Sequence, residues 1–157
     1  LVTYPWPIIR MAELYLNYAE AYNEYYGPDQ KVYDALNKIR ERSGVPTVES
    51  AWENAAIAKT VNKHKTQEGL REIIKQERRI EMSFEGHRNF DVRRWKEADK
   101  YFNIPVTGWS VDGSTTNTFY VVKTVGQRSF ITPRDYLHPI KYSEMLVNSN
   151  LVQNPGW

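Results

Sequence analysis

The 157 residues of this chain suffice for one globular domain with a core, and 41% apolar with 25% charged residues excludes a disordered chain. The 21 basic and 19 acidic residues leave a formal charge of +2, so no strong field indicates nucleic acid as a partner. The absence of cysteine excludes disulfides, thiolate metal sites and cysteine nucleophiles, and no apolar run is long enough to span a membrane.

Two helices joined by a short turn are expected at the start of the chain. Apolar residues keep helical spacing from Ile8 to about Tyr25, and Gly27 and Pro28 end that pattern. A second helix is predicted over 29–42, with Gly44 as its stop. Such a pair resembles a tetratricopeptide unit. Because one unit cannot bury its own apolar face, its neighbours are expected upstream, outside this sequence.

Three further helices are predicted in the next segment. Ser50 and Glu53 have the spacing of a capping box, which predicts a helix over 51–61. The strongest periodicity follows Thr66, a candidate cap, and predicts an amphipathic helix that ends near Gly86. Its apolar stripe consists of Leu70, Ile73, Ile74, Ile80 and Phe84. A shorter helix is expected from about Phe90 to Lys100.

Charged residues crowd this amphipathic helix and the segment after it. An unpaired charge beside a core is costly, so the sequence predicts a structural network of carboxylates and guanidiniums. Its expected members are Glu77, Arg78, Glu81, Arg88, Asp91 and Arg94. We expect Glu77 or Glu81, largely shielded from water, to accept hydrogen bonds from arginines of the 88–94 segment.

Catalysis has little support in the sequence. Helical carboxylates spaced four residues apart can hold two metals or act as an acid and base, but no Glu-x-x-His motif accompanies Glu77, Glu81 or Glu85. The histidines are scattered and expected at the solvated surface, and no nucleophile elbow, phosphate loop or dinucleotide fingerprint is present. We therefore predict no catalytic residues, no metal site and no cofactor.

The remainder of the chain, 102–157, is predicted to be an irregular section with a short β-hairpin. Turn-forming residues dominate 107–117, which is interpreted as a surface loop. Strands are expected over 118–125 and 127–132, on either side of Gly126. Residues 142–146 are expected to form one or two helical turns before an extended C-terminal strap.

The aromatic content suggests a binding surface. The chain has 11 Tyr, 5 Trp and 5 Phe, and flat side chains with polar tips suit the apolar faces of sugar rings. Tyr15, Tyr18 and Tyr22 share helical spacing and Trp95 is expected in the core, whereas Trp6 and Trp52 fit either role. Trp109 lies in a loop with no packing pattern. Trp109, with Asp112 and Asn117 as hydrogen-bonding neighbours, is therefore the predicted ligand-binding group.

Several ordered motifs resemble those of one protein family. Residues 77–95, ERRIEMSFEGHRNFDVRRW, closely resemble the signature of the SusD/RagB family of glycan-capturing surface lipoproteins of Bacteroidetes-type bacteria. The other blocks that resemble this family are 10–21, 36–44, 137–140 and 150–157. Lys141 and Ser149 stand where the family has prolines, and Trp157 stands where it has tyrosine.

The resemblance implies a mainly α-helical C-terminal region spanning 1–157, made of a tetratricopeptide-like pair (1–45), helices with the signature block (46–101) and the irregular section (102–157). It implies non-catalytic capture of an oligosaccharide at the outer-membrane surface and hand-over to a SusC-like TonB-dependent transporter. Since the chain opens on Leu1 rather than methionine, the export signal and lipid anchor are expected outside it. The alternatives are a helical-repeat scaffold that binds a protein or peptide, and a carboxylate hydrolase.

Overall fold

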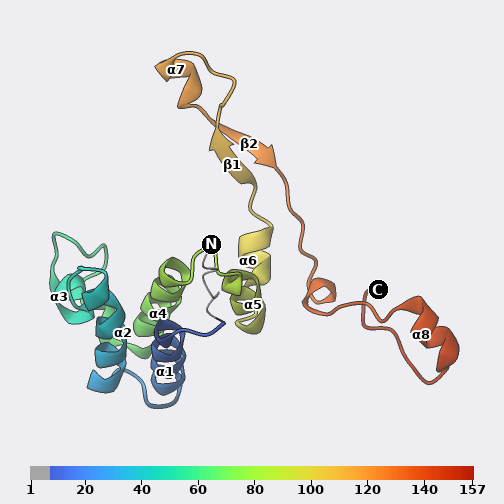
Figure 1. Cartoon of the computed structure of the whole chain (residues 1–157), viewed down its shortest axis with the longest axis horizontal. Coiled ribbons are helices and arrows are strands. Elements are labelled where there is room, and N and C mark those ends of the chain that lie inside the picture. The colour runs from blue at the N-terminus through green and yellow to red at the C-terminus, as the bar shows by residue number, and fades with distance from the viewer. Residues whose placement is uncertain (1–7) are drawn as a thin grey trace, which may run out of the picture. The chain divides into compact units, whose positions relative to one another are not determined.

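The computed structural model describes residues 8–157, which divide into two compact units, one ending at Arg88 and the other beginning at Asn89. The chain is mainly helical with a single antiparallel strand pair among the described residues, which confirms the predicted fold class (Figure 1). The boundary between the units falls inside the predicted 46–101 segment. Within 8–157, no helix is both long enough and apolar enough to cross a membrane.

The first unit is built from helices that share one core. Its elements are α1 (Met11–Tyr26), α2 (Gln30–Arg42), α3 (Val48–Glu53), the 3₁₀-helix η1 (Lys63–Lys65) and α4 (Gln67–Glu81). The predicted turn between α1 and α2 is confirmed: Gly27 has a left-handed φ of 84°, and the Asp29 carboxylate caps α2 by accepting the Lys31 N–H at 2.9 Å. Leu16, Leu36 and Leu70, from α1, α2 and α4, are fully buried together.

Helix α4 begins as predicted but ends early. Thr66 accepts the Gly69 N–H at 3.1 Å, which confirms the cap. The helix ends at Glu81 rather than near Gly86, and Phe84 has a left-handed φ of 65°. Phe84 lies beyond the end of the helix, whereas Ile80 is still within α4. Both are exposed and do not continue the buried stripe.

Helix α3 and the residues after it also differ from the prediction. The helix begins at Val48, with Thr47 rather than Ser50 as the cap, and ends at Glu53. His64, predicted at the surface, is buried; its backbone carbonyl accepts the Tyr33 hydroxyl at 3.1 Å. Burial lowers the pKa of His64, because the charged imidazolium loses solvation there.

The second unit contains shorter elements. They are α6 (Ala98–Phe102), β1 (Val106–Trp109), α7 (Thr116–Phe119), β2 (Val122–Gly126), the 3₁₀-helix η2 (Arg134–Tyr136) and α8 (Tyr142–Val147), and α5 (His87–Arg94) crosses the unit boundary. A small cluster of Val92, Ala98 and Phe130 forms its buried core. The short helix predicted over 142–146 is confirmed by α8.

The hairpin exists, but its strands differ from the predicted pair. β2 pairs with the earlier segment β1, and Gly126 is the last residue of β2 rather than the turn (Figure 1). The segment 127–132, predicted as the second strand, is not part of the strand pair. The Asn103 side chain accepts the Phe130 N–H at 2.7 Å and donates to the Phe130 carbonyl at 3.1 Å, so this backbone is paired with a side chain instead of a strand.

The C-terminal strap has no regular element after α8 and is fixed by side-chain hydrogen bonds. The Gln153 amide accepts the Ile140 N–H at 2.8 Å and donates to the Ile140 carbonyl at 2.9 Å. Asn154 donates to the His138 carbonyl at 2.6 Å. The Trp157 indole N–H lies 3.1 Å from the Arg134 carbonyl. These side-chain hydrogen bonds satisfy backbone groups that would pair with a neighbouring strand if the segment lay in a sheet.

Candidate functional site

The charged cluster around Glu77 and Glu81 of α4 is the structural ion-pair network that the sequence predicts. Glu81, with a side chain only 8% exposed, accepts hydrogen bonds from Arg10 and, at 2.7 Å, from Arg42. Glu77 is 17% exposed and pairs with Arg40. The prediction that Glu77 or Glu81 is shielded is confirmed. The prediction that its partners come from 88–94 is wrong.

The reason for these partners lies in the packing of the helices. α4 contacts α1 and α2, so its inward carboxylates face arginines at the start of α1 and the end of α2. Arg10, the residue before α1, also donates to Glu85 at 2.6 and 2.9 Å. This bond raises the pKa of Arg10 and lowers the pKa of Glu85, because each charge favours the other.

The other predicted network members make separate contacts. Buried Arg78 donates to the Asn17 side-chain oxygen Oδ1 at 2.7 Å, and buried Asp91 pairs with Arg94 at 3.0 Å. Arg88 is half-buried near the start of α5. Residues 8–157 contain no group of three or more His, Asp or Glu that could hold a metal ion. The charges of Glu77 and Glu81 are thus committed to holding helices together.

The end of the hairpin is a second, tightly closed structure. The Ser110 N–H donates to the carbonyls of Phe119, at 3.1 Å, and Val121, at 2.9 Å. Thr115 and Thr118 form a capping box at the start of α7. The segment 107–117, predicted as a loop, therefore begins with the last three residues of β1 and ends inside α7. Loops fixed in this way hold binding groups with little loss of entropy.

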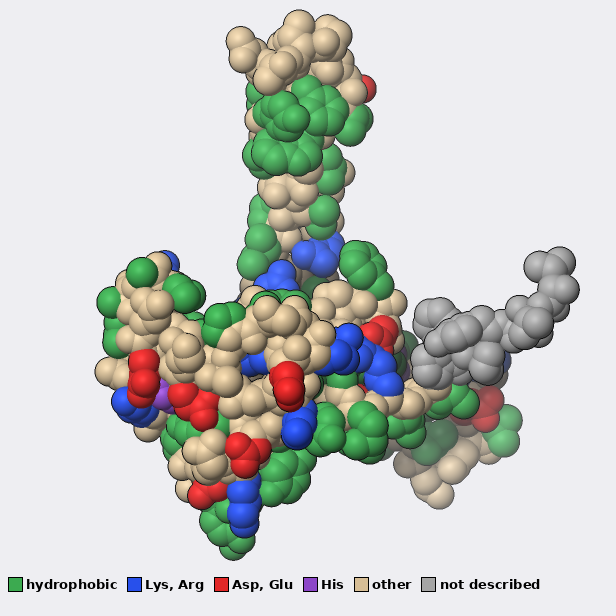
Figure 2. Space-filling model, turned by 60° about the vertical axis from the view of Figure 1, so that its left-hand side comes forward, with side chains coloured by type: hydrophobic (Ala, Val, Ile, Leu, Met, Phe, Trp, Pro, Cys, Tyr) green, Lys and Arg blue, Asp and Glu red, His purple; other side chains and the backbone are tan. Residues whose placement is uncertain are grey.

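Trp109 lies on an exposed aromatic surface of this hairpin. Its ring is 52% exposed and meets the Tyr120 ring edge-on, with centroids 5.4 Å apart. Tyr120 is itself 62% exposed, and Val122, opposite Trp109 in the ladder, is also exposed. Figure 2 shows hydrophobic side chains gathered on the hairpin near its tip. We call Trp109, Tyr120 and Val122 the aromatic face.

Asp112 and Asn117 lie together, but not with Trp109. They line a depression of about 360 Å³ with Ser110 and Lys123. Lys123 pairs with Gly108 in the ladder, whereas Trp109 pairs with Val122. Since neighbouring strand residues point to opposite faces, Trp109 lies on the face opposite this depression. The structure therefore brings Asp112 and Asn117 together and places Trp109, the third predicted ligand residue, on the opposite face of the hairpin.

Tyr120 and Lys123 were not predicted as site residues. The signal that could have found them is the pairing of β2 with β1, which sets Tyr120 on the side of Trp109 and Lys123 on the other. Sequence reasoning assigned 118–125 to a different hairpin, so this relation was lost.

The close approach of the chain at Gly113 gives a test of the tip. A Cβ atom there would lie 2.4 Å from the Thr118 carbonyl carbon and 2.5 Å from the Phe119 nitrogen. We expect Gly113→Ala to open the tip at a cost of about 1–3 kcal/mol. The measurement is hydrogen exchange of the Ser110 amide, which should become faster.

Gly126→Ala is the matched control in the same hairpin. Nothing lies within 4 Å of a Cβ at Gly126, so its effect should stay within about 0.5 kcal/mol. Equal Ser110 exchange rates in the two variants would contradict the close approach described here.

Comparison with known proteins finds one family over nearly the whole chain. The family model for the SusD family matches residues 2–157. SusD-like protein P2 of Formosa agariphila is 30% identical over 150 residues, which cover 95% of this chain and 25% of that protein. The chain thus spans about a quarter of the length of this curated relative.

Solved structures give the same result. The structure of BT4246 matches with a TM-score of 0.80 and 34% identity, covering 99% of this chain and 24% of that one. A SusD-like carbohydrate-binding protein of Bacteroides fragilis matches with a TM-score of 0.71 and 31% identity, covering 93% of this chain and 28% of that one. The similarity therefore includes fold and sequence over nearly the whole chain.

Proposed function

This chain belongs to the SusD family, and on that premise we propose that the protein containing it binds oligosaccharides without changing them chemically. The bound sugar would pass to a SusC-like TonB-dependent transporter at the outer-membrane surface. A lipid anchor outside this chain would hold the protein there. The carbohydrate-binding protein of Bacteroides fragilis, similar over 93% of this chain, supports the sugar as ligand.

The observation that carries the proposal is the aromatic face of the hairpin. Trp109 and Tyr120 expose about half of their surface each while their positions are fixed by the Ser110 hydrogen bonds and by their mutual edge contact. A sugar presents C–H groups on one side of its ring, and such a patch packs well on an indole. Large aromatic rings left in water on a fixed hairpin contribute little to stability, which favours a role in recognition.

A binding titration tests the proposal. The full-length protein is first screened on a glycan array, and a retained oligosaccharide is then titrated by calorimetry into wild type and Trp109→Ala. We expect Trp109→Ala to weaken binding by about 1–2 kcal/mol, roughly tenfold, because a partly buried aromatic contact is lost. Its melting temperature should change little, since the ring is 52% exposed.

Tyr142→Ala is the matched control. Tyr142 lies in the same unit and is 72% exposed, so its replacement removes a similar exposed aromatic surface at a position outside the hairpin. An array with no retained glycan would refute the proposed function. Equal affinity of Trp109→Ala and wild type would refute the aromatic face as the site.

One observation favours the alternative of a protein- or peptide-binding scaffold. A groove of about 470 Å³ runs along α1 and α2 and is lined by Met11, Leu14 and Tyr18, each roughly half exposed. Apolar grooves between helices are suited to amphipathic segments. The same titration separates the two functions. A scaffold would bind no sugar, and its partner affinity would fall in Leu14→Asp but not in Trp109→Ala.

A further inference from the structure

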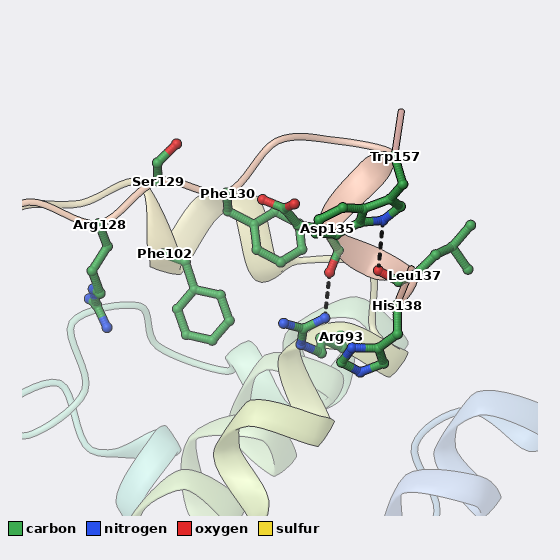
Figure 3. Close-up of a pocket in the computed structure, with 9 residues that line it drawn as sticks. All are labelled: Arg93, Phe102, Arg128, Ser129, Phe130, Asp135, Leu137, His138 and Trp157. Carbon is green, nitrogen blue, oxygen red and sulfur yellow. Dashed lines mark hydrogen bonds between the residues drawn. The ribbon is translucent and has the colours of Figure 1, made fainter. Parts of the chain in front are cut away.

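A second cavity in the unit that begins at Asn89 differs in chemistry from the hairpin. Its volume is about 380 Å³, and its lining includes Arg93, Phe102, Arg128, Phe130, His138 and Trp157. Figure 3 shows the two arginines and the two phenyl rings around the same space, with the indole of Trp157 above. The combination is basic and aromatic, and neither the structural network nor the proposed sugar platform uses it.

Arg93 is held in place without a carboxylate. Its guanidinium donates to the backbone carbonyl of Asp135 and, at 3.2 Å, to the Asn89 side-chain oxygen. It also lies over the Phe130 ring, 5.3 Å from the centroid. Both hydrogen-bond acceptors are neutral, so these contacts orient the positive charge without a direct ion pair, and the Asp135 carboxylate acts on it only through space.

Arg128 resembles Arg93 in its surroundings. It donates to the Tyr101 carbonyl at 3.2 Å and lies over the Phe102 ring at 5.6 Å. Among the described residues no carboxylate pairs with either arginine. Two guanidiniums, each over a phenyl face and each bonded to a backbone carbonyl, therefore border one cavity.

The one side-chain carboxylate that lines the cavity is already engaged. Asp135 accepts Arg134 at 2.7 Å on one oxygen and the Ile131 N–H at 2.7 Å on the other. The bond with Arg134, which is not a lining residue, lowers the pKa of Asp135. The direct ion pair of Asp135 is with Arg134, so neither lining arginine has a carboxylate bound to its guanidinium. The side chains of the lining carry more positive than negative charge.

We propose that this cavity binds the anionic group, a carboxylate or a sulfate, of an acidic sugar residue. Planar guanidiniums recognise these groups through paired N–H donors. The rings of Phe102, Phe130 and Trp157 supply apolar surface for the sugar ring that carries the charge. The inference rests on the proposed function and narrows it to acidic oligosaccharides.

The test compares charged probes with neutral counterparts on the full-length protein. One arm uses trigalacturonate and its methyl ester, and the other uses a sulfated galactose disaccharide and its desulfated form. We expect tighter binding of the charged member in at least one arm. The arm in which this occurs shows whether the cavity recognises a carboxylate or a sulfate. Arg128→Gln should weaken that member about tenfold and leave the neutral member unchanged, since one charge-assisted contact is lost.

Lys141→Gln is the control, because it removes one exposed positive charge from the same unit outside the cavity. Lys141→Gln should change neither the affinity for the charged probe nor the affinity for the neutral probe. Equal binding of charged and neutral probes in both arms would overturn the inference, as would equal behaviour of Arg128→Gln and Lys141→Gln. Loss of neutral-sugar binding in Trp109→Ala would still support the proposed function, so the two failures are distinguishable.

Discussion

Glu81→Gln is expected to lower the free energy of unfolding by about 2–3 kcal/mol. The Glu81 side chain is 8% exposed and holds two guanidiniums, Arg10 from the start of α1 and Arg42 from the end of α2. Breaking a fully buried ion pair costs roughly 3–5 kcal/mol, because the remaining charge is left without a partner. Arg10 is 28% and Arg42 63% exposed, so water screens part of that loss.

Urea denaturation measures this effect, with Glu72→Gln as the matched control. Glu72 pairs with Lys63 but is 60% exposed, and its replacement should cost no more than about 0.5 kcal/mol. If both variants unfolded at the same urea concentration as wild type, Glu81 would have no structural role.

Phe130→Ala is expected to destabilise the second unit by about 3–4 kcal/mol. Phe130 is 6% exposed and is the largest of the three buried members of its cluster, so its truncation removes much of that core. Its ring also packs on Phe102 and Tyr136, with centroids 5.8 and 4.8 Å apart. Limited proteolysis should show cleavage within 89–157 at much lower protease concentration.

Phe90→Ala is the control for this substitution. Phe90 is 72% exposed in α5, and its removal should leave the cleavage pattern unchanged. Cleavage of Phe130→Ala that began in the first unit instead would show that Phe130 is not the centre of the second core.

Local patterns in the sequence predicted α1, α2 and the start of α4 well, but not the bounds of α3 or the break between α5 and α6. The spacing of apolar residues located α1 and α2, and the short polar side chain of Thr66 marked a helix start that the structure confirms. These features depend on contacts within a few residues, which a single sequence shows directly. The end of α4 was missed because Phe84 continues the apolar period while its backbone has already left the helix.

Long-range pairing was harder to predict. Arginines near Glu81 in the sequence suggested its partners, yet the actual partners lie 71 and 39 residues earlier. The prediction of the hairpin strands was wrong because it also depended on long-range pairing: Val122 pairs with the earlier residue Trp109 rather than with a later one. The polar half of the candidate site was predicted as a group, whereas the position of Trp109 depended on that unknown register.

Arg10 also has a consequence for the order in which the first unit folds. Its bonds to Glu81 and Glu85 span 71 and 75 residues of sequence. Closing a loop costs more chain entropy the longer it is, and this cost precedes the gain from the contact. The contacts of α1 with α2 through Leu16 and Leu36 close a much shorter loop and can form first. The contact that ties α1 to the end of α4 therefore completes the first unit late in folding.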